Sequence, residues 1–182
     1  PTNDRRQRQM CIRDRYKSEA IFQRERDQMF ARLPAVAAHV SELTNPGDFV
    51  KREIAGRSIL VTRDAHGEVY AFLNICRHRG TQLVDDESGC KHRFSCSYHA
   101  WSYANMGELV SVPHMATGFP DLDKAQYSLK SLQCEERFGF IWGIATPDIT
   151  FDFDAYYSPI AAEAEGLDLA NMDIAHEEKK VH

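Results

Sequence analysis

Two Cys-His pairs constrain the fold of this chain more than any other feature of its sequence. Cys76-Arg77-His78 is followed, after seventeen residues, by Cys96-Ser97-Tyr98-His99. Each pair begins where a predicted strand runs into a loop, so loops at neighbouring strand ends can present two thiolates and two imidazoles to a common centre. The five Cys and eight His among 182 residues would produce both pairs at a suitable separation in roughly one sequence in a thousand. The pattern therefore predicts a metal site between two loops.

The sequence from residue 46 to 146 consists of short runs rich in β-branched and aromatic residues. Turn sequences at Asp64–Gly67 and Asn105–Gly107 separate such runs at hairpin spacing, and we expect another turn at Glu135-Glu136. Seven or more short strands joined in this way predict a mainly β, antiparallel fold rather than alternating strands and helices. The predicted strands lie in FVKREI, RSILVTR, EVYAFLNI, RFSCSY, WSYAN, ELVSV, SLKSLQC and FGFIWGIA.

Two further segments flank this β region. Residues 16–45 are expected to form an N-terminal helical segment, because Tyr16–Leu33 places apolar residues among charged ones and stops at Pro34. Residues 147–182 read as an acidic connector with helical tendency, in which nine acidic residues from Asp148 onward face only two lysines. The domain prediction is thus helix, β domain and connector in that order.

Residues 1–15 form a basic arm with five arginines against two aspartates, in a chain of net charge -5. The arm is similar to the spurious leaders on some translated environmental reads, so it need not be native sequence, and we leave it out of the fold prediction. No basic face with interleaved aromatics follows it, which argues against a nucleic-acid partner. The chain also lacks a secretory apolar region and any run of about 18 apolar residues that would span a membrane. We therefore expect a cytoplasmic protein with no membrane partner.

The ligand types leave more than one kind of metal centre open. The order Cys, His, Cys, His differs from the common zinc finger, although a mononuclear zinc ion would accept these four ligands in any order. A Rieske centre needs two Cys on one iron and two His on the other, which is the set that the pattern offers. A second pair, Cys90-Lys91-His92, lies only three residues before Cys96. That link is too short to place ligating loops on opposite sides of a cluster, so this pair is interpreted as a turn thiol and a surface histidine.

The two loops resemble those of a known family. The strings NICRHRGTQLV (74–84) and FSCSYHAWSYANMGEL (94–109) are similar to the cluster-binding loops in the N-terminal Rieske domain of the alpha subunits of aromatic-ring-hydroxylating oxygenases. A weaker likeness extends from about Tyr16 to the FGFIWG strand. The resemblance implies a Rieske-type antiparallel β sandwich with two cluster-binding loops and flanking helices at both ends.

The resemblance also implies a set of site residues around one 2Fe-2S cluster. Cys76 and Cys96 would bind the inner ferric iron, and His78 and His99 the outer, reducible one. Backbone amides near the cluster would donate to its sulfurs, and a tryptophan would pack beside it. The further cofactor-binding positions are Arg79, Gly80, Tyr98, Ala100 and Trp101.

Two positions depart from the family pattern. Ser97 stands where the family often has proline, and Ala100 where it usually has glycine. The methyl group of Ala100 requires its backbone either to adopt a negative φ or to carry strain. Neither change removes a ligand.

The reduction potential can be predicted by comparing this chain with the high-potential Rieske proteins of respiratory complexes. Those proteins have an extra cysteine in each loop and a serine that donates to a bridging sulfur, whereas this chain has Thr81, Tyr98 and Trp101 at the matching positions. Fewer hydrogen bonds stabilise the reduced cluster less, so we expect a potential around -150 mV, at the low end of the Rieske range. The missing disulfide also suits a reducing cytosol.

The function implied is that of an electron-transfer component of a Rieske non-haem iron oxygenase, an oxidoreductase. Electrons would come from a reductase or ferredoxin and pass to a mononuclear Fe(II) held by two His and one carboxylate. No Asp-x-x-His-x3-4-His pattern occurs in the chain, so that iron and all catalytic residues would belong to an absent C-terminal domain. The full-length protein would be a homotrimer, with or without a beta subunit. The alternatives are a stand-alone Rieske ferredoxin and a zinc-stabilised binding module.

Overall fold

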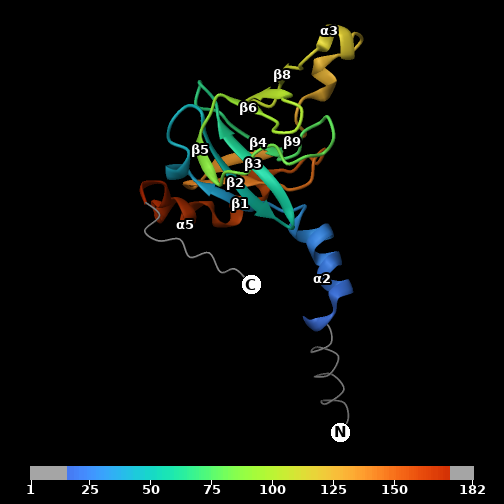
Figure 1. The fold of residues 1–182 in the computed structure, drawn as a ribbon. Coiled ribbons are helices and arrows are strands. Elements are labelled where there is room, and N and C mark those ends of the chain that lie inside the picture. Colours follow the sequence, from blue (N-terminus) through green and yellow to red (C-terminus); the bar gives the residue numbers. More distant parts are fainter. Residues whose placement is uncertain (1–15, 173–182) are drawn as a thin grey trace.

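The computed structural model describes residues 16–172 and consists mainly of antiparallel strands (Figure 1). The central sheet has the order β5-β2-β3-β4-β9, a second sheet has the order β1-β11-β10, and a third has the order β6-β7-β8. No helix in this part of the chain is long and apolar enough to cross a membrane. The predicted mainly β, antiparallel fold class is confirmed.

The strands of the central sheet are β2 (Asp48–Ile54), β3 (Arg57–Arg63), β4 (Val69–Leu73), β5 (Ser88–Cys90) and β9 (Ser131–Leu132). The second sheet contains β1 (Ala35–His39), β10 (Cys134–Arg137) and β11 (Phe140–Gly143). The third contains β6 (Arg93–Ser95), β7 (Ser102–Ala104) and β8 (Leu109–Ser111). The α-helices are α2 (Glu19–Glu25), α3 (Met115–Gly118), α4 (Phe153–Tyr157) and α5 (Ala161–Gly166).

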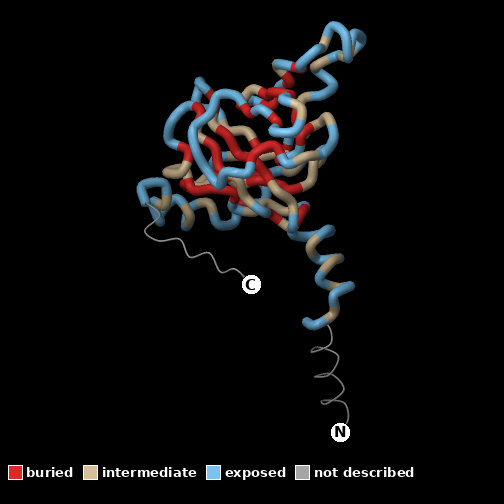
Figure 2. Tube along the Cα trace, viewed as in Figure 1, coloured by how far each residue is buried: buried red, intermediate tan, exposed pale blue. Residues whose placement is uncertain are grey.

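The middle of the central sheet is buried on both faces at β3, which explains the unbroken apolar run in this strand (Figure 2). Successive side chains of a strand point to opposite faces. Leu60 therefore packs into one core cluster with Cys76, Cys96 and Trp101, whereas Val61 packs into another with Ile141. The face that carries Leu60 supports the two Cys-His loops, and the opposite face supports the sheet of β1, β10 and β11.

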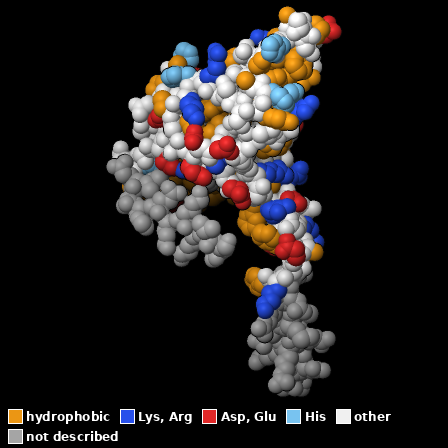
Figure 3. Space-filling view, viewed as in Figure 1, with side chains coloured by type: hydrophobic (Ala, Val, Ile, Leu, Met, Phe, Trp, Pro, Cys, Tyr) orange, Lys and Arg blue, Asp and Glu red, His pale blue; other side chains and the backbone are white. Residues whose placement is uncertain are grey.

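The segment of residues 16–45 is helical over only part of its length. Helix α2 begins after Ser18, whose hydroxyl accepts the amide of Ile21, and continues as a π-helical turn over Arg26–Phe30. Residues Ala35–His39 form strand β1, which corrects the expectation of a helical segment up to residue 45. Pairing of β1 with β11 is a tertiary contact that decides the structure there. The helical part projects from the body and leaves hydrophobic side chains on its surface (Figure 3).

The expected turn at Glu135-Glu136 is also wrong. Both residues belong to β10, and the hairpin turns at Phe138 and Gly139, with φ of 53° and 79°. A two-residue hairpin turn whose backbone twist matches that of the flanking strands requires positive φ at both of its residues. At Gly139 a side chain would collide with the backbone of Ala170, since a Cβ would lie 2.4 Å from its amide nitrogen.

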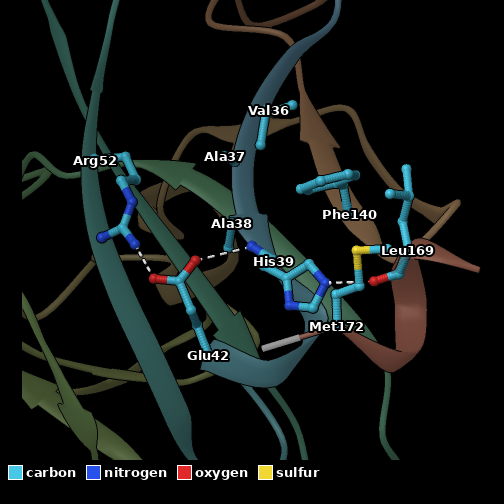
Figure 4. A pocket seen from close by; sticks show the side chains of 9 residues that line it. All are labelled: Val36, Ala37, Ala38, His39, Glu42, Arg52, Phe140, Leu169 and Met172. Atoms are coloured by element: carbon cyan, nitrogen blue, oxygen red, sulfur yellow. Dashed lines mark hydrogen bonds and ion pairs between the residues drawn. The ribbon is translucent and has the colours of Figure 1, made fainter. Parts of the chain in front are cut away.

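The acidic connector packs against the body instead of leaving it directly. Phe153 and Tyr157 of α4 are buried against Trp142 of β11. Farther on, His39 of β1 approaches the carbonyl oxygen of Leu169 with its Nε2 at 2.9 Å. His39 and Leu169 line an apolar cavity of about 310 Å³ beside β1 (Figure 4). The described end of the connector is therefore held on the sheet of β1 and β11.

Candidate metal centre

The two Cys-His loops have the same backbone construction. In the loop after β4, the Cys76 amide donates to the carbonyl of Thr81 at 2.8 Å, and the Gly80 amide donates to the carbonyl of Cys76 at 3.0 Å. In the loop between β6 and β7, the Cys96 amide donates to the carbonyl of Trp101 and the Ala100 amide to that of Cys96, both at 2.9 Å. Each cysteine thus anchors a closed five-residue turn that also carries a histidine.

Two buried thiols lie near each other at the base of these loops. Cys76 and Cys96 are only 2% and 4% exposed, both are free, and both belong to the same core cluster. Burial raises the pKa of the Cys76 thiol, and Cys96 raises it further, while donors from the Tyr103 hydroxyl and the His78 amide oppose the rise. Two neighbouring buried thiols, with donors directed at one of them, form a ligand pair for a thiophilic metal.

The two imidazoles are also adjacent. The rings of His78 and His99 have centroids 4.6 Å apart. The Nδ1 atoms of both rings are buried without a hydrogen-bond partner, a state that costs free energy unless another group satisfies the nitrogen. Burial lowers the pKa of His78, and His99 and Arg79 lower it further, which favours the neutral imidazole that binds metals. Two unsatisfied nitrogens at one place fit the histidine side of a two-iron cluster.

Aromatic side chains enclose the histidine pair on one side. Trp101 is fully buried and stacks on His78 at 4.7 Å between ring centroids, and Phe119 meets the same ring edge-on at 5.9 Å. On the other side Tyr98, 57% exposed, lies against His99 at 3.8 Å. Water is therefore kept from one flank of the imidazoles, while the other flank lies near the surface.

The two residues that close the loop turns share a backbone conformation. The amides of Gly80 and Ala100 donate to the carbonyls of Cys76 and Cys96, and both residues have left-handed backbones, with φ of 74° and 55°. Arg79 and Gly80 are exposed at the loop tip. Ala100 thus adopts the conformation for which a strain cost was expected.

A functional residue missed by the sequence analysis is Tyr103 of β7. Its hydroxyl oxygen lies 3.4 Å from the Sγ of Cys76 and accepts the amide of Arg77 at 3.0 Å. The signal that could have revealed it is the period of two in a strand, which places Tyr103 on the same face as Trp101. Both side chains are fully buried in the core that supports the loops.

The four residues predicted as ligands therefore form a pair of neighbouring thiols and a pair of adjacent imidazoles. Within residues 16–172, no three His, Cys, Asp or Glu side chains are arranged around a single metal ion. The observed grouping of like ligands is the one that a cluster with two Cys on one iron and two His on the other requires.

Comparisons with known proteins agree with this site. Residues 34–133 match the Rieske 2Fe-2S domain. The chain is 38% identical over 162 residues to the large oxygenase component of the 2,4-dinitrotoluene dioxygenase system of Burkholderia sp. (strain RASC), which covers 85% of this chain and 36% of that protein. It is 38% identical over 159 residues to the corresponding component of the naphthalene 1,2-dioxygenase system of Pseudomonas aeruginosa, covering 83% and 35%.

Solved structures give the same result. Naphthalene 1,2-dioxygenase with bound indole superimposes with a TM-score of 0.72 at 36% identity, over 77% of this chain and 32% of that one. A quaternary ammonium Rieske monooxygenase in complex with L-carnitine gives a TM-score of 0.74 at 30% identity, over 85% and 43%. The chain spans about a third of the length of the curated relatives.

Proposed function

Because the chain belongs to the Rieske 2Fe-2S domain family, we propose that its two loops hold one cluster and that it transfers electrons within an aromatic-ring-hydroxylating oxygenase. The proposed ligands are Cys76, Cys96, His78 and His99. The observation that carries this assignment is the pair of buried, unpartnered Nδ1 atoms on adjacent imidazoles, together with two buried thiols in the same core cluster. When bound, the cluster accepts and returns one electron at the iron on the histidine side.

The surrounding residues prepare this site for electron exchange. Burial of the thiols and the stacked Trp101 keep water from the cluster's inner side. The imidazoles lead outward to a surface formed by Tyr98 and Arg79, both exposed. Electrons are thus expected to enter and leave through the histidine ligands, with Arg77 and Arg79 beside them to orient a negatively charged donor.

The role within an oxygenase rests on the similarity to large oxygenase components of dioxygenase systems. We assign the electron supply to a reductase or ferredoxin and the electron acceptor to a mononuclear Fe(II) in a C-terminal domain. The assembly would be a homotrimer, with or without a beta subunit, in the cytoplasm. Residues 16–45, 46–146 and 147–182 would serve as N-terminal segment, Rieske domain and connector.

A fusion experiment tests this role. The chain is joined to the C-terminal two thirds of the naphthalene 1,2-dioxygenase large component, loaded with iron, reduced anaerobically and mixed with naphthalene and oxygen. The expected result is reoxidation of the cluster together with hydroxylated naphthalene. The native large component is the control.

Two outcomes would contradict the proposal. A fusion that binds both iron centres but keeps its cluster reduced would favour the stand-alone ferredoxin. Hydroxylated product from the 182-residue chain alone would show that the reaction does not need a mononuclear iron site in a C-terminal domain.

A further inference from the structure

A second Cys-His pair lies outside the cluster loops. Cys90 ends β5, and His92 follows it in the link to β6. This stretch runs beside the Asn45–Asp48 turn, because Cys90 pairs with Asp48 and the amide of Lys91 donates to the carbonyl of Gly47 at 2.8 Å. Cys90 and His92 are both exposed. The backbone that carries them is therefore fixed by the sheet, while their side chains are at the surface.

The two side chains converge over Gly47. A Cβ placed on this glycine would lie 3.1 Å from the Sγ of Cys90 and 2.9 Å from the Nδ1 of His92. Sulfur and ring nitrogen thus lie close to one point above Gly47, and therefore close to each other, because residue 47 has no side chain to separate them. Its φ of 92° independently favours glycine there.

The remaining contacts leave both donor atoms available. Lys91 points elsewhere, with its Nζ 2.7 Å from Asp86 and 5.4 Å from the ring centroid of Phe49, as alternation along an extended chain requires. In the described part of the chain, His92 makes no hydrogen bond or ion pair, and the Cys90 thiol makes only a 3.6 Å contact to the carbonyl of Pro46. An exposed thiol and an imidazole without a hydrogen bond therefore lie close together above Gly47.

We propose that Cys90 and His92 form a surface site for one Cu(I) ion, separate from the cluster. Thiolate is a soft ligand that selects Cu(I), and imidazole suits copper as well. Two ligands are sufficient for this ion, whereas zinc takes four, at least three of them from the protein in the known site types. The types of the two ligands, and the fact that there are two of them, therefore favour Cu(I) over zinc.

The test uses the cluster-loaded, full-length chain under anaerobic conditions. Cu(I) is titrated against a chromophoric Cu(I) chelator, and the cluster absorption is recorded in the same samples. The variants Cys90→Ser and His92→Gln remove one ligand each. Cys134→Ser and His66→Gln are matched controls, because they change a thiol and an exposed histidine elsewhere.

The expected result is one Cu(I) per chain with the cluster absorption unchanged. Cys90→Ser should lose this ion, His92→Gln should bind it about 100-fold more weakly, and both controls should bind as the parent chain does. Equal binding by the His92→Gln variant would overturn the site by showing that a lone thiol suffices. Copper uptake matched by loss of cluster absorption, or no uptake at all against the chelator, would overturn it as well.

Discussion

The Tyr103 hydroxyl is fixed between the amide of Arg77, 3.0 Å away, and the Sγ of Cys76, 3.4 Å away. Since the oxygen accepts the amide proton, its own proton is free to point at the sulfur. This relationship gives the cysteine side of the site a donor that the loop sequences alone do not indicate. A donor to a ligating sulfur stabilises the reduced, more negative state.

Replacing Tyr103 with phenylalanine is therefore expected to lower the reduction potential. A hydrogen bond to a charged acceptor contributes about 1.5 kcal/mol, which corresponds to a decrease of about 60 mV for one electron. Redox titration followed by visible absorption measures this shift. Tyr127→Phe, which changes a ring beside Trp101, is the control; equal potentials in the parent chain and the Tyr103→Phe variant would show that the hydroxyl does not act on the cluster.

The equivalent positions Gly80 and Ala100 should respond to substitution in opposite directions. Both backbones are left-handed, with φ of 74° and 55°, and such a conformation costs an alanine about 1 kcal/mol. Ala100→Gly should raise the free energy of unfolding by about that amount, and Gly80→Ala should lower it by as much. No atom lies within 4 Å of a Cβ at Gly80, so this change tests conformation alone. Urea unfolding followed by tryptophan fluorescence measures both; shifts of the same sign would refute the account.

The carboxyl of Asp64 makes the stability of the fold depend on pH in the acidic range. Burial alone would raise the pKa of its carboxyl, but the amides of Glu68 and His66, at 2.9 and 2.8 Å, outweigh it, and the pKa lies below its ordinary value. The folded state then gains stability above about pH 4, where the unfolded carboxyl is ionised, and loses it as pH falls through the lowered pKa.

The variant Asp64→Asn should consequently be less stable than the parent chain at pH 7, with a difference that shrinks below pH 4. Thermal unfolding across this range measures the effect. Asp121→Asn makes the same charge change at an exposed position and should alter stability little. A pH-independent difference for Asp64→Asn would mean that the carboxylate's charge plays no part.

Local sequence patterns are sufficient to predict the two Cys-His loops and most strands. The Cys-His spacing identified residues that meet in space, because each loop is a short closed turn with its own hydrogen bonds. Strands β2, β3 and β4 followed from apolar runs between glycine-containing turns. Their structure depends mainly on neighbouring residues.

The missed features depend on distant contacts. Residues Ala35–His39, expected to be helical, become strand β1 by pairing with β11 far along the chain. Tyr103 lies 27 residues from the cysteine that it contacts. Neither relationship is encoded within a window of neighbouring residues, so only the tertiary structure reveals them.

The most direct test of the central claim is electron paramagnetic resonance of the anaerobically purified chain, before and after dithionite reduction, with iron, sulfide and zinc quantified in the same sample. The site predicts two irons and two sulfides per chain, a rhombic signal only after reduction, and nitrogen hyperfine coupling from two imidazoles that is lost in His78→Ala and His99→Ala variants. A colourless protein with one zinc ion, or a reduced cluster without imidazole coupling, would contradict it.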